Sequence, residues 1–263
     1  MRLRSIVLTI IFLCMIGGLL AGFFSHSIEA ALTLQSINGT RQTGAVTPTS
    51  TPVATSGQPK APTPVPGGAV VLAKDTFQRA VQTFWGTASD GHLWAGDANS
   101  IEVFSIAGGV GQIGHGNGAF NAVLGPLSTN AEVVFNASVN HFAAGNVNMG
   151  AVLRWTDSKN WYKALIDGAR LQILSSVNGT ITSLATMPFQ ARDGVTYSLR
   201  FRTLGANLFV RAWQSNQTEP VNWMLTVSNT ALTQGMGGLR MLTQSVTIIK
   251  VTSFLETTVV SPS

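Results

Sequence analysis

The chain is poor in cysteine, in charge and in basic clusters, and each shortage excludes a class of protein. Its only cysteine, Cys14, lies inside an apolar run, so the rest of the chain cannot form disulfides and must be held by its own core. Charged residues make up only 10% of the 263 residues, and the lysines and arginines form no run or helical stripe. The net charge of +5 is therefore spread thinly, which argues against nucleic acid as a partner.

Paired carboxylates and clustered histidines are also scarce. Beyond residue 30 only ten Asp and Glu residues remain, and no two of them lie two to five residues apart on one predicted strand. A retaining glycosidase needs two carboxyl groups about 5 Å apart, so glycoside hydrolysis is disfavoured, although a pair assembled from distant strands stays open. The three histidines beyond the first 30 residues are widely spaced, which disfavours a transition-metal site. We predict that the chain is not an enzyme.

The N-terminus has the pattern of an export signal. Arg2 and Arg4 precede an apolar run over 6–24, and small residues follow, with Ala30 the best candidate for the last residue removed. The apolar run is also long enough to span a bilayer, so residues 1–30 are either a cleaved signal peptide or a retained signal anchor. In both cases the basic N-terminus stays in the cytoplasm and the rest of the chain lies outside. The membrane is expected to be contacted only through this segment.

Residues 31–68 form a spacer rich in Thr, Pro, Ser and Gly. Prolines stand at positions 48, 52, 59, 62, 64 and 66. Such dense prolines remove backbone donors and fix φ, so we expect a disordered, extended linker. The order of leader, linker and folded domain predicts an extracellular or cell-surface protein, either secreted or tethered.

The remaining chain, 69–257, has the alternation of an all-β domain, followed by a short disordered tail over 258–263. Apolar and polar residues alternate in runs that are separated by turn residues about every ten positions. Asn178-Gly179 is the strongest turn, because both residues accept positive φ. Thirteen strands are predicted, at 70–73, 101–106, 110–114, 131–140, 147–156, 161–167, 170–177, 180–186, 195–204, 208–214, 223–228, 238–243 and 246–254. They indicate two packed antiparallel sheets.

One predicted hairpin, 197–214, allows its two faces to be assigned. With the loop at 204–207, Phe201 faces Val210 on an apolar surface, while Arg200 faces Arg211 on the other, because a one-residue slip would bury arginines. Like charges opposite each other cost stability unless carboxylates or cation–π contacts offset them. The polar surface, with Arg200, Arg202, Arg211 and Trp213, is thus either a paired arginine ladder or a ligand-facing floor.

The segment 152–167, VLRWTDSKNWYKALID, resembles the central hairpin of concanavalin A-like jelly rolls. Within that superfamily it is similar to the laminin-G-like and keto-disaccharide-hydrolase-like modules of secreted bacterial proteins. The openings Asp75-Thr-Phe-Gln-Arg and Gly91-His-Leu-Trp94 and the later Tyr197-Ser-Leu-Arg-Phe-Arg resemble the same modules. The resemblance spans about residues 70–256 and implies a two-sheet jelly roll with a concave face where many members bind sugars. It carries less weight for activity, because this fold hosts lectins, adhesion modules and hydrolases.

The resemblance also implies candidate binding residues. In the hairpin they are Arg154, Trp155, Asp157, Asn160, Trp161 and Tyr162, for which turn-forming and core-filling roles are the alternative. Lectin-like jelly rolls often hold calcium at a loop rim, and Asp90, Asp97 and Asn99 are the candidate ligands here; no other cofactor is expected. The function predicted is a monomeric, non-catalytic module that binds carbohydrate, such as a polysaccharide or cell-wall glycan, or another surface ligand on its concave face. A structural or adhesive domain without a small ligand and a glycoside hydrolase are the alternatives. An exposed tryptophan cluster would favour binding, and buried tryptophans the structural role.

Overall fold

The computed structural model describes residues 68–260. The predicted leader, residues 31–67 of the linker and residues 261–263 lie outside this part. Sixteen strands and one three-residue 3₁₀ helix, η1 (Ala143–Gly145), make up the described region. Among these residues there is no helix with the length and hydropathy of a membrane span.

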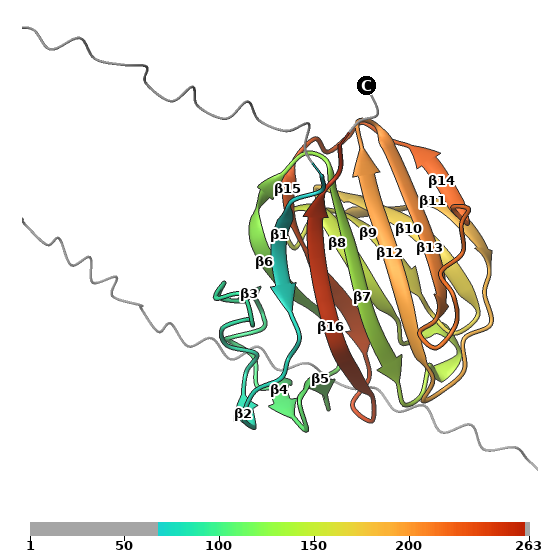
Figure 1. Cartoon of the computed structure of the whole chain (residues 1–263). Coiled ribbons are helices and arrows are strands. Elements are labelled where there is room, and N and C mark those ends of the chain that lie inside the picture. Colours follow the sequence, from blue (N-terminus) through green and yellow to red (C-terminus); the bar gives the residue numbers. More distant parts are fainter. Residues whose placement is uncertain (1–67, 261–263) are drawn as a thin grey trace, which may run out of the picture. The chain divides into compact units, whose positions relative to one another are not determined.

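The strands form two antiparallel sheets, which confirms the predicted all-β sandwich (Figure 1). We call them the front sheet and the rear sheet, as they lie in Figure 1. In spatial order the front sheet contains β14 (Leu225–Ser228), β13 (Asn207–Gln214), β12 (Thr196–Leu204), β7 (Ala131–Val139), β16 (Ile248–Thr258), β5 (Val110–Gly114), β4 (Phe104–Ala107) and β2 (Gln82–Thr83), with β1 (Val71–Asp75) also paired to β16. The rear sheet contains β11 (Thr180–Pro188), β10 (Arg170–Val177), β9 (Asn160–Ile166), β8 (Met149–Asp157), β15 (Gly235–Thr243), β6 (Gly118–Ser128) and β3 (Ala95–Gly96).

Alternation along the strands builds the core between the sheets. In β7, Val133, Phe135 and Ala137 are fully buried, whereas Val134 and Asn136 between them are half-buried on the outer surface. Successive strand residues point to opposite faces, so this period of two turns one face of each sheet inward. The result is one continuous apolar core without any disulfide.

The hairpin of β12 and β13 has the register that the sequence predicts. Phe201 pairs with Val210, Arg200 with Arg211, and the turn closes between Leu204 and Asn207. Asn178 and Gly179 have φ of 52° and 84°, as the predicted β10–β11 turn requires. Both confirmations depend on local rules of strand alternation and turn chemistry.

The eleven-residue strand β6 was not predicted, and neither were the two-residue strands β2 and β3. The sequence of β6 contains Gly125 and Pro126, which normally interrupt strands. The pairing with β15 is irregular at this point, since Gly237 faces Leu124 but Gly235 faces Ser128. Gly125, with φ of 88°, and Pro126 therefore lie in a bulge, where both residues are tolerated.

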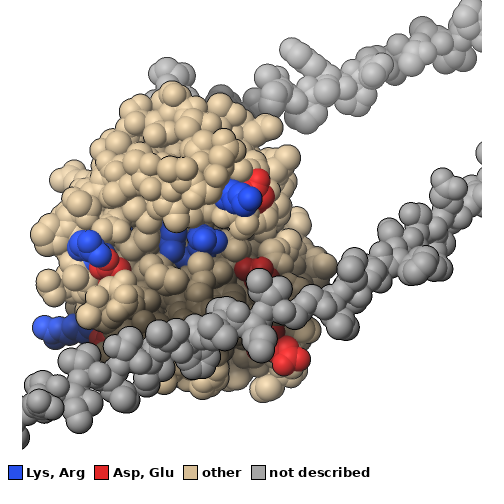
Figure 2. Space-filling model, turned by 180° about the vertical axis from the view of Figure 1, so that it is seen from behind, with Lys and Arg blue, Asp and Glu red and all other residues tan. Residues whose placement is uncertain are grey.

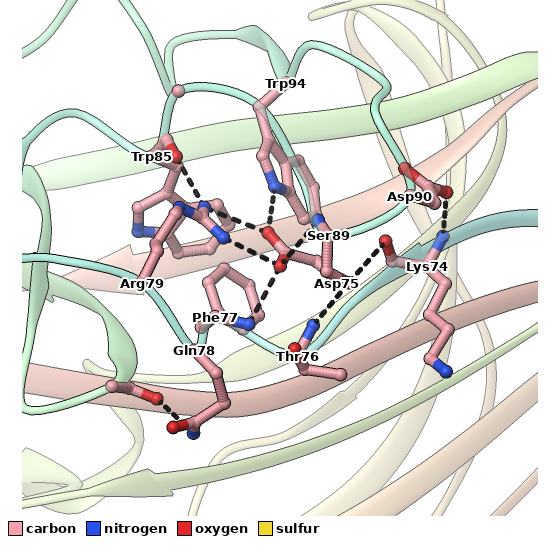
Figure 3. A network of polar contacts seen from close by, with 12 residues as sticks. Lys74, Asp75, Thr76, Phe77, Gln78, Arg79, Trp85, Ser89, Asp90 and Trp94 are labelled. Carbon is pink, nitrogen blue, oxygen red and sulfur yellow. Dashed lines mark hydrogen bonds and ion pairs between the residues drawn. The ribbon is translucent and has the colours of Figure 1, made fainter.

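A buried ion pair attaches the loops after β1 to the sandwich (Figure 3). The Asp75 carboxylate, which has no exposed surface, accepts hydrogen bonds from Arg79 at 2.8 and 3.0 Å and from the Trp94 indole at 2.7 Å. Arg79 also donates to the Trp85 carbonyl oxygen. The Trp85 and Trp94 rings meet edge to face at 4.8 Å. Asp75, Arg79 and Trp94, which belong to the segments that carried the resemblance at the start of the domain, thus contact one another and have a structural role.

Candidate functional site

The outer face of the front sheet carries the predicted arginine ladder. Arg200 forms ion pairs with Glu132 of β7 and with Glu219, while Arg202 bonds Glu132 at 2.6 Å. The Nε of Arg211 lies 2.5 Å from Glu219 outside hydrogen-bond geometry, so this contact is an ion pair only. Every arginine of the ladder is therefore matched to a carboxylate, as one of the two sequence interpretations requires.

An aromatic ring completes the ladder. The Trp223 ring lies 4.8 Å from the Arg202 guanidinium and 4.5 Å from that of Arg211, within cation–π range. Burial raises the pKa of Glu219, but its hydrogen bonds with Arg200 and the positive charges of Arg200 and Arg211 outweigh burial and lower the pKa overall. Glu219 is thus held ionised. Trp213, the ring that the sequence placed on this face, is half-buried beside the ladder.

Most of the predicted hairpin residues already have partners within the protein. Arg154 is buried with φ of 51° and donates to the carbonyl oxygens of Thr129, Gly205 and Leu232, thereby joining three loops. These loops line a cavity of about 250 Å³ at one end of the sandwich. The Tyr162 hydroxyl bonds Asn229 at 2.6 Å from within the core. A ligand-binding role for Arg154 or Tyr162 remains a prediction.

Asp157 and Asn160 close the β8–β9 turn. The Asp157 carboxylate accepts from the Lys159 backbone at 2.7 Å and from the Asn160 amide at 3.0 and 3.1 Å. These bonds lower the pKa of Asp157, led by the contact with Asn160. Asn160 also accepts from the Asn178 backbone at 2.8 Å, which ties two neighbouring turns together. The predicted turn-forming role of both residues is confirmed.

The two tryptophans of the hairpin lie elsewhere, on the outer face of the rear sheet. Trp161 forms a small apolar cluster with Val123 and Val152, separate from the main core, and the half-buried Trp155 packs against it. The Trp155 indole nitrogen is buried and has no hydrogen-bond partner in the described region. The structure thus divides the predicted site residues among the outer face of the front sheet, one end of the sandwich and the outer face of the rear sheet.

Beside this cluster lie two basic side chains that sequence reasoning missed. Lys163 of β9 is 4% exposed and donates to the Asn148 side chain at 2.5 Å. Its methylenes run across Gly150, where any side chain would collide with the Lys163 Cε. The Arg240 guanidinium, on β15, donates to Asn121 at 2.5 Å and lies 4.9 Å from the Trp161 ring. We call Lys163, Arg240, Asn121 and Asn148 the rear basic cluster.

The electrostatics of the rear basic cluster differ from those of the ladder. Burial, and then the positive charge of Arg240, lower the pKa of Lys163 well below its usual 10.5. Burial also lowers the pKa of Arg240, against the opposing charge of Asp97. Asp97 itself accepts from the Asn121 backbone at 2.8 Å and from its amide at 3.1 Å. Within residues 68–260, neither cation lies within 4.0 Å of a carboxylate oxygen.

Figure 2 shows the molecule from behind, on the side of the rear sheet. Basic side chains lie near the middle of this face, and the surface beside them is hollowed. The cluster comes from β6, β9, β15 and the residue before β8, so no local motif announces it. One signal was present in the sequence: strand alternation places Lys163 on the same side of β9 as Trp161.

The predicted calcium ligands each serve a different loop contact. Asp90 accepts from the backbones of Lys74 and His92, and Asn99 bonds the Gly86 backbone at 2.6 Å and the Trp94 carbonyl at 2.7 Å. Asp97 is bonded to Asn121, as described above. In the described region no three His, Cys, Asp or Glu side chains are placed to hold a metal ion. A calcium site at these residues therefore stays a prediction, and the structure does not bring the three side chains together as a set of ligands.

Comparison with solved structures supports the fold. No family model matches the sequence, and no curated protein sequence matches it. The structure is similar to the GH43 protein BlXynB of Bacillus licheniformis (11% identity, TM-score 0.52) and to xylan β-1,4-xylosidase of Bacillus halodurans (15%, 0.50). These matches cover 71% and 70% of this chain but only 39% and 38% of those two chains. The carbohydrate-binding module CBM66 of Bacillus subtilis gives 14% identity and a TM-score of 0.49, over 61% of this chain and 94% of the module.

The chain has a two-sheet antiparallel jelly-roll fold. This confirms the resemblance drawn from the sequence at the level of the fold. Identities of 10–16% across the similar structures show architecture alone.

Proposed function

We propose that this chain is a non-catalytic glycan-binding module that receives its ligand on the outer face of the rear sheet. The observation that carries the proposal is the rear basic cluster, in which Lys163, Asn121 and Asn148 are buried and Arg240 is half-buried. It lies on a sheet face that is turned toward solvent, next to the partly exposed ring of Trp155. Sugar sites combine aromatic or apolar surface with a few well-placed polar groups.

The two outer faces differ in how much hydrogen-bonding capacity they have left. On the front sheet the arginines and glutamates of the ladder are bound to one another. In the rear basic cluster, one of the three ammonium protons of Lys163 is used by Asn148, and one donor of Arg240 is used by Asn121. The rear face therefore has more donors without a partner, and the half-buried Arg240 presents them to a hydroxyl-rich ligand more openly than Lys163, which is 4% exposed.

The environments of Glu132, Glu219 and Glu256 support a non-catalytic role. Glycoside hydrolysis needs an acid with a raised pKa beside a second carboxylate in an open groove. Glu132 and Glu219 are neutralised by arginines, and the pKa of Glu219 is lowered. Glu256 has a pKa raised to about 8, but its side chain is completely buried between the sheets. Neither arrangement meets the requirement, and the likeness to xylosidases extends only to the fold.

A structural domain without a ligand is the rival function. Three tryptophans, Trp85, Trp94 and Trp161, are buried, which favours that rival. The partly exposed Trp155 beside unused donors favours binding. We place the module outside the cell, secreted or tethered by residues 1–68, and take a polysaccharide or cell-wall glycan as its partner. Residues 1–67 lie outside the described region, so the location rests on the sequence pattern.

The test is a glycan array probed with the full chain in mild detergent, with and without calcium. Trp155→Ala on the rear face is compared with Trp213→Ala on the front face, where the sequence suggested an alternative floor. We expect Trp155→Ala to weaken binding about tenfold, as removal of a sugar-contacting ring does, and Trp213→Ala to leave it unchanged. The reverse pattern would move the site to the front face. Retention of no glycan at all would favour the structural rival.

A further inference from the structure

Lys163 and Arg240 are neighbouring cations without a carboxylate partner among residues 68–260. The front sheet provides an internal comparison, because its three ladder arginines all contact Glu132 or Glu219. In the described part of the chain no ion pair includes Lys163 or Arg240. Their partners are the neutral side chains of Asn148 and Asn121 and the ring of Trp161.

Holding such a pair is costly for the free protein. An unpaired buried charge loses its hydration without a compensating partner, and a second cation nearby adds repulsion. The depressed pKa of Lys163 reflects both effects. A methionine of similar length would fill the space above Gly150 without this penalty, so a purely structural role does not account for a lysine.

The charges of Lys163, Arg240 and Asp97 indicate the charge that a ligand should carry. Among the described residues, Asp97 is the carboxylate whose charge acts on Arg240, and its oxygen is already bonded to Asn121. With both basic groups protonated, the cluster carries two positive charges and one negative charge. A single negative charge on the ligand would complete it. The planar guanidinium suits a two-oxygen anion, and the ammonium adds a point charge beside it.

We propose that Lys163 and Arg240 together bind the anionic substituent of an acidic sugar, the carboxylate of a uronic acid or a sulfate ester, on the rear face. This inference rests on the glycan-binding function proposed above and names its ligand class. Asn121 orients Arg240 and Asn148 orients Lys163, while the region around Trp155 contacts the rest of the sugar. Neutral glycans would use the same face more weakly.

Three probes test the inference by titration calorimetry on the full chain in mild detergent: trigalacturonate, a sulfated galactan trisaccharide and neutral galactotriose. We expect one or both acidic probes to bind at least tenfold more tightly than galactotriose, with an affinity that falls as salt rises. The stronger acidic probe identifies carboxylate or sulfate as the preferred group.

Lys163→Met is the decisive variant, because it keeps the approximate volume of the side chain and removes the buried amino group. We expect it to weaken acidic-probe binding by tenfold to a hundredfold, about the range for a charged hydrogen bond, and to leave galactotriose binding unchanged. Circular dichroism and thermal unfolding check that it folds. Lys250→Met, an exposed lysine of β16 on the front sheet, is the matched control and should bind like the native chain.

The outcomes separate this inference from the proposed function. Equal affinity for acidic and neutral probes, or unchanged acidic binding in a folded Lys163→Met variant, would overturn the acidic-sugar inference and leave glycan binding intact. Failure of every probe and of the whole array would overturn both.

Discussion

Replacing Glu256 by glutamine should change how the stability of the fold depends on pH. The Glu256 carboxyl lies between the sheets with no exposed surface. One oxygen accepts a long hydrogen bond of 3.4 Å from Ser128, and the other has no partner. Gly237 packs directly against the carboxyl group. Burial raises the pKa to about 8 from an ordinary value of 4.5, and only the Ser128 contact opposes the shift.

The sign and size of the effect follow from this shift. A folded-state pKa above the unfolded value means that the native protein keeps a proton that the unfolded chain releases. The contribution of the neutral acid is complete below pH 4.5 and is lost as pH rises toward 8. At about 1.4 kcal/mol per pKa unit, a shift from 4.5 to about 8 corresponds to roughly 5 kcal/mol.

Urea unfolding of the native chain and of Glu256→Gln at pH 5, 6, 7 and 8 measures this contribution. The amide is uncharged throughout, and its unpaired N–H costs a constant ~1–3 kcal/mol. We expect the free energy of unfolding of the native chain to fall relative to the variant by up to about 1.4 kcal/mol per pH unit. Asp157→Asn, in an exposed turn, should show no such divergence, because the lowered pKa of Asp157 lies below this window. Parallel curves for the native chain and Glu256→Gln would refute a neutral buried acid.

Three further substitutions test the packing and the ion pairs. Asp75→Asn leaves the Arg79 guanidinium without its buried anion and should lower the free energy of unfolding by about 3 kcal/mol in urea titrations. Arg154→Met removes the four hydrogen bonds that join three loops and should cost about 2–4 kcal/mol, with faster amide exchange in those loops. Glu219→Gln unpairs the partly exposed end of the ladder and should lower the melting temperature by the equivalent of about 1 kcal/mol at low salt, and less in high salt.

Those features of the fold that follow from local rules were predictable. The faces of β12 and β13 were assigned because a slip would bury Arg200 and Arg202, and the structure has that register. Asn178-Gly179 and the Asp157–Asn160 turn follow in the same way from their side chains. In each case the deciding interactions lie within one hairpin or between adjacent turns.

The rear face could not be predicted because its parts are distant in the sequence. Asn121 lies on β6, a strand obscured by Gly125 and Pro126, and Arg240 lies on β15, which joins β6 only through sheet pairing. Strand alternation from Trp161 could have placed Lys163 on this face, but no neighbouring residue in the sequence indicates that Lys163 is buried. The same limit applies to Trp223, which reaches the arginine ladder from a loop and not from a paired strand.

Photo-crosslinking most directly tests where the ligand binds. A diazirine-bearing form of the tightest-binding oligosaccharide, irradiated with the full chain and followed by peptide mass spectrometry, reports the face that it contacts. We expect labels on β8, β9 and β15, at 149–166 and 235–243, that unlabelled oligosaccharide competes away. Competed labels confined to the front sheet, at 196–214 and in the loop that carries Glu219, would contradict it.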